Sequence, residues 1–164
     1  MKRIIFVIVI LSLYNCKYLS MPESKYIETY YPDSTLQAAG NLLLPDSVKQ
    51  NRWYFYYDNG DTMKVVDYKR GEIHGLYKVF DKNGGYSMGI KHGNMKIGYW
   101  QSRDSVGNLE FYETYNDSGL LDGDAGFFED GKLKLTRKYD NGEIVSERYF
   151  TFDEEGNYHV YDTQ

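Results

Sequence analysis

Cysteine, proline and long apolar segments are scarce in this sequence. Cys16 is the single cysteine, and there are three prolines in 164 residues. A lone cysteine cannot form an internal disulfide, so the chain is not a disulfide-stabilised scaffold. The one long apolar stretch, Ile4 to Leu13, is too short to span a bilayer as a stable helix, which needs about 20 apolar residues.

A surplus of positive charge is also absent. The chain has 19 Lys and Arg residues against 24 Asp and Glu residues, a formal net charge of -5, and loss of a segment with Lys2 and Arg3 makes it -7. Nucleic-acid affinity comes from Lys and Arg neutralising phosphates, and adhesion to anionic lipid needs a basic face. We therefore expect neither nucleic acid nor an anionic lipid surface as a partner of the mature domain.

Strong catalytic and metal-binding motifs are missing as well. "GYSMG" (85–89) matches G-x-S-x-G, but a nucleophile elbow needs a strand, a sharp turn and a helix, and no helical pattern follows Ser87. His74 and His92 precede glycines in turn segments, and two histidines without a third ligand make a poor zinc site. We expect no enzyme activity, no metal and no cofactor.

The N-terminus has an export pattern. Lys2 and Arg3 precede the short apolar run, as in a secretory signal peptide, here residues 1–15. A short N-terminal anchor or a buried strand is the alternative.

Cys16 directly follows this segment, and "LYNC" (13–16) resembles a bacterial lipoprotein box, in which the cysteine becomes the lipidated first residue. Tyr14 and Asn15 replace the usual small residues, as in the looser boxes of Bacteroidetes-type lipoproteins; an incidental cysteine is the alternative. Acyl chains on Cys16 would hold the protein at a membrane by about 0.8 kcal/mol per buried CH₂. Lys17 in place of Asp implies, by resemblance to sorting rules, the outer membrane. Residues 16–27 are then a lipid-attached tether.

Glycines recur with a period of about 24 residues in the rest of the chain. The first series is Gly60, Gly84, Gly107, Gly131 and Gly156; the second is Gly71, Gly93, Gly119 and Gly142; the third is Gly75, Gly98 and Gly123, with Ser146 next in phase. A fixed period of this length is typical of repeat architectures. Ser34 occupies the glycine position of a weaker first unit, "YYPDSTL" (30–36).

Each period predicts a β-hairpin. Turn segments such as "YYDNG" (56–60) and "YKRGEIHG" (68–75) alternate with short strands rich in Tyr, Phe, Trp and Val, such as Arg52–Tyr57 and Leu76–Phe80. One turn of helix within "STLQAAGNLLL" (34–44) is the only competing pattern. We predict an all-β domain over 28–164, in which tandem hairpins form an elongated, twisted, antiparallel and largely single-layer sheet. Its 18 tyrosines suit such a sheet, because the ring can pack while the hydroxyl stays in water.

Alternation along the strands assigns the aromatic residues to two faces. Trp53, Phe55 and Tyr57 share one face, and Tyr54 and Tyr56 share the other. Trp53, Tyr77 and Trp100 occupy the same position in consecutive units, which predicts a ladder along one face. The ladder is either the packed stripe of the sheet or an exposed one, and the recurrence of internal contacts in repeats favours the packed stripe. Ala125 and Arg148 stand at this position in the last two units.

These units resemble the MORN-repeat variant family, which contains YwqK-type antitoxin proteins. The similarity covers most of residues 52–157 and includes "YKRGEIHGLYKVFDKNG" (68–84) and "YNDSGLLDGDAGFFEDGKL" (115–133). The resemblance implies a twisted antiparallel sheet that binds other molecules, and it implies no catalytic residues.

The sequence therefore predicts an exported lipoprotein whose sheet binds a protein partner, with an antitoxin or immunity role as one form. The candidate binding or ladder aromatics are Trp53, Tyr54, Tyr56, Tyr77 and Trp100. A glycan-binding module, with Trp53 and Trp100 as stacking platforms, and a structural envelope component are the alternatives. Four Asp-Ser/Thr-aliphatic segments, at 33–35, 46–48, 61–63 and 104–106, resemble glycosylation sites of exported Bacteroidetes proteins, or are simply turns.

Overall fold

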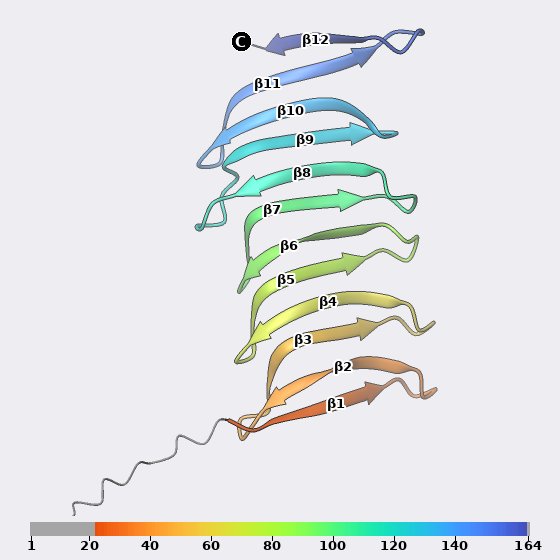
Figure 1. The fold of residues 1–164 in the computed structure, drawn as a ribbon, viewed down its shortest axis with the longest axis vertical. Coiled ribbons are helices and arrows are strands. Elements are labelled where there is room, and N and C mark those ends of the chain that lie inside the picture. Colours follow the sequence, from red (N-terminus) through yellow and green to blue (C-terminus); the bar gives the residue numbers. More distant parts are fainter. Residues whose placement is uncertain (1–21, 164) are drawn as a thin grey trace, which may run out of the picture.

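A computed structural model describes residues 22–163 as one antiparallel sheet of twelve strands (Figure 1). Each strand pairs with its neighbours in sequence, so the spatial order is the chain order. The strands are β1 (Ser24–Tyr30), β2 (Leu36–Leu43), β3 (Val48–Tyr56), β4 (Thr62–Lys69), β5 (Glu72–Phe80), β6 (Tyr86–His92), β7 (Met95–Arg103), β8 (Leu109–Tyr115), β9 (Gly123–Glu129), β10 (Lys132–Asp140), β11 (Glu143–Phe152) and β12 (Tyr158–Thr163). The predicted all-β array of tandem hairpins is confirmed.

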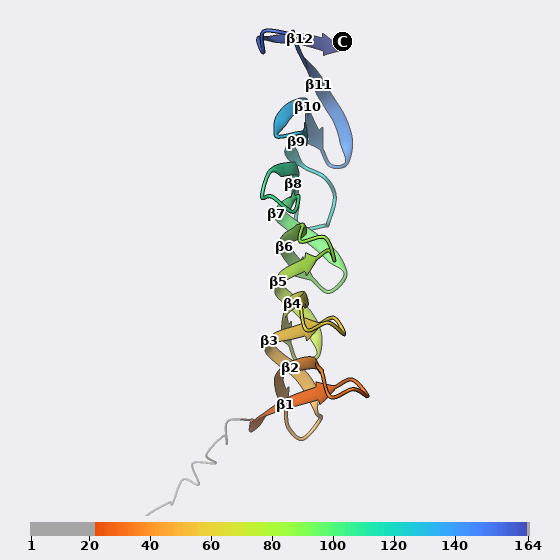
Figure 2. The same ribbon diagram turned by 90° about the vertical axis from the view of Figure 1, so that its right-hand side faces the viewer.

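The sheet forms a single layer. β1 and β12 lie at opposite ends of an elongated array, and the side view in Figure 2 shows no second layer on either face. Between residues 22 and 163 there is no helix long and apolar enough to cross a membrane.

The N-terminal boundary of the sheet differs from the prediction. β1 begins at Ser24, and Lys25 to Ile27 pair with Leu42 to Gly40 of β2, so residues 24–27 belong to the sheet rather than to the tether. Residues 36–43 are likewise a strand, not a turn of helix, because they pair on both sides. The predicted signal peptide (1–15) and Cys16 lie outside the described residues.

Five-residue turns connect most hairpins on one side of the sheet. At Tyr57–Asp61 the N–H of Gly60 donates to the Tyr57 carbonyl at 3.0 Å, and the Asn59 side-chain oxygen accepts the N–H of Asp61. Gly60 has a φ of 87°, and Ser34 takes the same role in the first unit with a φ of 70°. Asp33 and Asp104 accept backbone N–H groups in equivalent turns, which gives these two Asp-Ser segments a local structural role.

Around β8–β10 the long turn and the short turn lie on the opposite sides of the sheet from those in the other units. Asp130 and Gly131 form a two-residue turn where the other units have five residues, and the five-residue turn, Asn116–Leu120, lies on the opposite side of the sheet. Both turns still fall in phase with the glycine series.

The turns on the other side of the sheet, which contain the second glycine series, are shorter than the sequence indicated. Only Arg70 and Gly71 turn between β4 and β5, and Gly75 lies inside β5 with a φ of 127°. The third glycine series therefore supplies left-handed residues within strands. Asn51 takes this place in β3 with a φ of 61°.

Hydrogen bonds outside the ladders join successive hairpins. The N–H groups of Gly71, Gly93 and Gly142 donate to the carbonyls of Lys49, Ile73 and Leu121 at 2.7–2.8 Å. The hydroxyls of Tyr31 and Tyr57 donate to the carbonyls of Tyr56 and Phe80, both at 2.8 Å. Each unit is thereby fixed to the next, as in other repeat proteins.

Most of the core lies on one face, which we call the inner face. Trp53 pairs with Val66, Val66 with Tyr77 and Tyr77 with Gly89, so their side chains share this face, and Trp100 reaches it over Gly89. Trp53 and Trp100 are only 2% and 3% exposed. The predicted ladder of Trp53, Tyr77 and Trp100 is therefore present, and it is packed.

Glycines in the neighbouring strands make room for the indoles. A Cβ atom on Gly89 would lie 2.3 Å from the Trp100 ring, and one on Gly40 would lie 2.4 Å from the Trp53 ring. The indole N–H of Trp100 donates to the Ile90 carbonyl at 3.1 Å, and that of Trp53 to the Asn41 carbonyl at 2.9 Å. Each indole thus packs on backbone and satisfies its only donor there.

Lysines cover the ladder in place of a second layer. The ammonium groups of Lys49, Lys91 and Lys96 lie 5.1, 4.3 and 4.8 Å from the ring centroids of Trp53, Tyr77 and Trp100. A lysine stem can cover apolar surface while its charged end reaches water and interacts with a ring face. Burial, followed by the charge of Lys64, lowers the pKa of Lys49.

The ladder position of the last unit is one residue earlier than predicted. Arg137 pairs with Ala125 on one side and with Glu147 on the other, so Glu147 continues the inner face. Arg148 pairs with Thr136 and belongs to the opposite, outer face. A register shift between Lys138 and Tyr139 accounts for the difference, because it changes which residue of β11 follows each face.

Candidate functional site

The five candidate aromatics are divided between the two faces. Trp53, Tyr77 and Trp100 lie on the inner face, whereas Tyr54 pairs with Ala39 and Val65 on the outer face. The two indoles expose too little area to act as stacking platforms. The glycan-binding alternative required Trp53 and Trp100 to be exposed in a row, and their burial contradicts that arrangement.

Four tyrosines gather on the outer face of β1–β3, and we call them the tyrosine surface: Tyr26, Tyr30, Tyr54 and Tyr56. Tyr26, Tyr30 and Tyr54 are 58%, 55% and 41% exposed. Their exposure contrasts with that of the inner indoles, and it makes this surface available for contact.

One carboxylate organises the β1 part of the tyrosine surface. The hydroxyls of Tyr26 and Tyr30 both donate to Glu28, which pairs in the sheet with the buried Ala39. Desolvation and then the charge of Glu28 raise the pKa of Tyr26, and the hydrogen bond to Glu28 is the main cause of the raised pKa of Tyr30. Tyrosine hydroxyls are protonated at neutral pH, so both donate to Glu28 and hold the two rings around it.

Sequence reasoning identified Tyr54 and Tyr56 but missed Tyr26 and Tyr30. Tyr26 falls within the predicted tether (16–27), which hides its alternation with Glu28 and Tyr30 as a strand pattern. The signal was present in "YIETY" (26–30), in which Tyr, Glu and Tyr alternate with the β-branched residues Ile and Thr.

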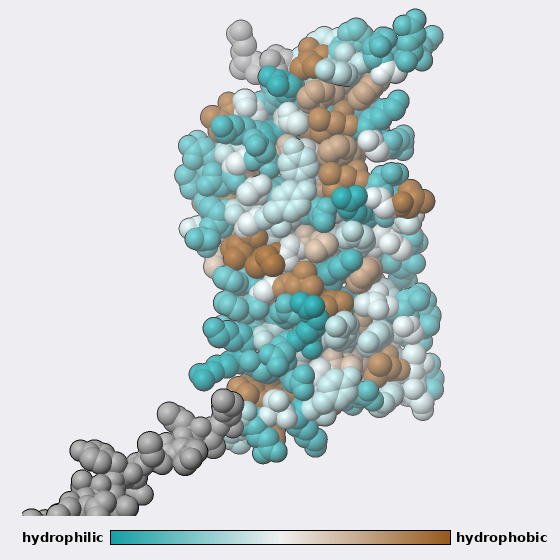
Figure 3. Space-filling model, in the orientation of Figure 1, coloured by the Kyte–Doolittle hydropathy of each residue, from teal (hydrophilic) through white to brown (hydrophobic). Residues whose placement is uncertain are grey.

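The outer face continues along the sheet with mixed character. A central row of paired residues runs through Tyr54, Val65, Lys78, Met88, Gln101 and Tyr112. Lys78 lies 3.7 Å from the Tyr86 ring centroid, and burial lowers its pKa. The face seen in Figure 3 shows hydrophobic side chains in small groups between hydrophilic ones.

The segments that resemble catalytic or metal-binding motifs have structural positions. Ser87 lies within β6, and its hydroxyl donates to that of Ser102 at 3.1 Å, so "GYSMG" is part of a strand rather than a nucleophile elbow. His74 and His92 pair across β5 and β6, with rings stacked at 4.2 Å. Residues 22–163 contain no group of three or more His, Cys, Asp or Glu side chains arranged to hold a metal ion.

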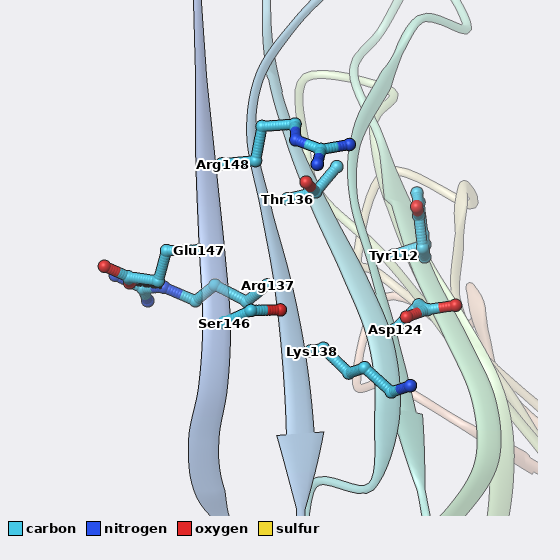
Figure 4. A pocket seen from close by; sticks show the side chains of 8 residues that line it. All are labelled: Tyr112, Asp124, Thr136, Arg137, Lys138, Ser146, Glu147 and Arg148. Atoms are coloured by element: carbon cyan, nitrogen blue, oxygen red, sulfur yellow. Dashed lines mark hydrogen bonds and ion pairs between the residues drawn. The ribbon is translucent and has the colours of Figure 1, made fainter. Parts of the chain in front are cut away.

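A groove of about 510 Å³ lies over β8–β11. Figure 4 shows Tyr112, Asp124, Thr136, Lys138 and Arg148 on one side of these strands, with Arg137 and Glu147 projecting to the other side. Arg137 donates to Glu147 there. The polar groove is therefore an outer-face feature, and no sequence motif marked it.

No protein-family model matches the chain, and no curated protein matches it.

Proposed function

We propose that this chain is an exported lipoprotein whose repeat sheet binds a protein partner through the tyrosine surface. The exposure of Tyr26, Tyr30 and Tyr54 on one face of β1–β3 carries the proposal. Tyrosine is enriched at interface hot spots, because it offers a large ring and a polar hydroxyl with few rotatable bonds.

The shape of this part of the sheet favours a protein over a small molecule. Paired strands of one layer present the tyrosines side by side, with Glu28 between Tyr26 and Tyr30. Small ligands are usually held in concave sites, whereas protein interfaces combine aromatic anchors with polar groups on broader surfaces.

The proposed lipid anchor would keep this surface near a membrane. Ser24, where β1 begins, is eight positions after Cys16. An extended chain spans at most about 3.6 Å per residue, so the first strand would lie within roughly 30 Å of the lipidated residue. The proposed partner is therefore a protein of the cell envelope, and an antitoxin or immunity role is the form suggested by the resemblance to the MORN-repeat variant family.

Tyr54→Ala and Tyr26→Ala are expected to weaken partner capture from the native envelope by about 30-fold each, which corresponds to a hot-spot loss of about 2 kcal/mol. Neither substitution should lower thermal stability strongly, because both rings are exposed. Tyr149→Ala, at an exposed position on β11, is the matched control and should leave capture unchanged. Unchanged capture with both surface variants would favour a structural envelope component.

Cys16→Ala is expected to abolish acylation and to move the protein out of the membrane fraction. The reason is that no other lipid attachment site is proposed, and acyl chains provide the membrane affinity. Incorporation of radiolabelled palmitate and membrane fractionation measure the two effects. Labelling that persists in the variant would refute the anchor without touching the binding proposal.

A further inference from the structure

The inner face of β1–β4 has an apolar groove of about 480 Å³. Its apolar lining comes from all four strands and consists of Ile27, Ala38, Leu42, Trp53, Phe55 and Met63. The floor is low because β2 has a small residue there: Ala38 pairs with Thr29 on one side and with Phe55 on the other. The lining follows β3 from Lys49 to Phe55, which is roughly 20 Å at about 3.3 Å per residue. The groove therefore suits an elongated ligand.

The unit that contains Trp100 fills the equivalent place with larger side chains. There Tyr77 pairs with Gly89, on which the indole packs. Lys91 follows two residues later and lies 4.3 Å from the Tyr77 ring centroid. In the first unit Ile27 pairs with Gly40, and Leu42 follows at the position of the lysine. The groove thus arises from two smaller, aliphatic side chains in the first unit.

Two half-buried ammonium groups accompany this apolar lining. Lys49 lines the groove, and Lys64 pairs with Phe55 beside it. Their Nζ atoms lie 4.9 and 4.5 Å from the Phe55 ring centroid. The groove lining contains no Asp or Glu, and within residues 22–163 none forms an ion pair with either lysine. Burial and then the charge of Lys64 lower the pKa of Lys49, and no neighbouring carboxylate offsets them.

Lys96 is the equivalent of Lys49 in the unit of Trp100, and it has a carboxylate partner. Each lysine precedes its indole by four residues and lies over that ring. Glu113 pairs with Trp100 in the sheet, and its carboxylate lies 3.7 Å from Nζ of Lys96. Val66 occupies the corresponding position opposite Trp53. The first unit therefore keeps the lysine over the indole but lacks the counter-charge.

We propose that this groove binds a hydrophobic monocarboxylate, a small organic acid with a linear apolar body. The apolar body would lie over Ala38 between Ile27 and Phe55. The carboxylate would take at Lys49 the place that Glu113 takes at Lys96, since ammonium groups form strong charge-assisted hydrogen bonds to carboxylates. The volume of about 480 Å³ lies within the range of small-molecule sites, which is about 300–1,000 Å³.

The composition of the groove discriminates against other occupants. A peptide carries an amide at each residue, and the apolar walls would leave those groups without hydrogen-bond partners. An acid without an apolar body would bury none of the aliphatic lining. A cationic amphiphile would meet the charges of Lys49 and Lys64. An apolar chain next to one carboxylate matches both parts of the groove.

Calorimetric titration of the full chain with decanoate tests the site. We expect saturable binding of one decanoate per chain and no binding of acetate or decyltrimethylammonium. Octanoate should bind about tenfold more weakly, because two buried methylene groups are lost. Lys49→Gln should weaken decanoate binding at least tenfold, whereas Lys49→Arg should retain it. Lys96→Gln is the matched control and should leave binding unchanged, because Lys96 has Glu113 as its partner and does not line the groove.

Further variants separate this site from folding and from the tyrosine surface. Ala38→Leu fills the floor of the groove and should abolish binding; circular dichroism identifies a variant that fails to fold, and the Lys49 variants then decide the result. Tyr54→Ala lies on the outer face and should leave decanoate binding unchanged, so the two proposals can fail separately.

Four results would overturn the proposal. They are absence of decanoate binding at millimolar concentration, binding of decyltrimethylammonium as tight as that of decanoate, tighter binding of decyl phosphate than of decanoate, and decanoate binding that Lys49→Gln leaves unchanged.

Discussion

Trp100→Ala is expected to lower the free energy of unfolding by about 3–5 kcal/mol and the Tm by roughly 10 °C. Trp100 is 3% exposed, its ring packs on Gly89, and its indole N–H donates to the Ile90 carbonyl. Removal of the ring would leave a cavity on the inner face and uncover the stem of Lys96. Circular dichroism of thermal and urea unfolding measures the loss.

Tyr99→Ala is the matched control for this substitution. Tyr99 is the adjacent residue, lies on the outer face and is 52% exposed, with its ring stacked on Tyr112. An aromatic pair is worth about 0.5–1.5 kcal/mol beyond area burial, so the cost should stay well below that of Trp100→Ala. Equal costs at the two positions would mean that the inner face is not the core of the sheet.

Gly89→Ala is expected to destabilise the chain by about 1–3 kcal/mol, because the new methyl group would overlap the Trp100 ring. The effect should disappear or reverse in the Trp100→Ala background. There the methyl group fills empty space, and alanine costs less conformational entropy than glycine in a strand. A double-mutant cycle measures the coupling between the two positions.

Gly98→Ala is the control for the cycle. A Cβ atom on Gly98 would meet nothing within 4 Å, although its φ of 61° makes alanine strained. Its cost of about 1–2 kcal/mol should therefore be the same with and without Trp100. A cost of Gly89→Ala that is equally independent of Trp100 would contradict the ring-on-glycine packing.

Glycine phase and turn chemistry were sufficient to predict the hairpin array. Gly60 and Ser34 both have positive φ values in equivalent turns, as the repeat pattern required. The ladder could be predicted for the same reason, since Trp53, Tyr77 and Trp100 recur at one position in consecutive hairpins. The sequence favoured packing of this ladder without deciding it, and the burial of both indoles decides it.

Local irregularities of strand pairing account for the differences between the predicted and the observed positions of residues. Gly75 has the same sequence signature as a turn glycine, yet it lies within β5. Only the pairing of the neighbouring residues distinguishes a bulge from a turn, so the signature alone could not place it. The register shift between Lys138 and Tyr139 moved Arg148 to the outer face by one residue. No single-strand pattern reveals such a shift, and a shift of one residue reverses the face of every side chain beyond it.

The polar groove could not be predicted from the sequence either, because it depends on cross-strand pairing. Gly126, Thr136 and Arg148 are separated along the chain, and only their cross-strand pairing places them in one row beside Tyr112. Half of the tyrosine surface could be predicted from the sequence. Tyr54 and Tyr56 lie within a recognisable unit, whereas Tyr26 precedes the region with a clear repeat.

Photocrosslinking in the native envelope tests most directly whether the outer face binds a protein. Tyr54→p-benzoylphenylalanine places a photoreactive group on the tyrosine surface, and the same substitution at Tyr77 places it in the inner ladder. A discrete protein adduct from position 54, and none from position 77, is the predicted result. Adducts from position 77 alone, or from neither position, would contradict binding through the outer face.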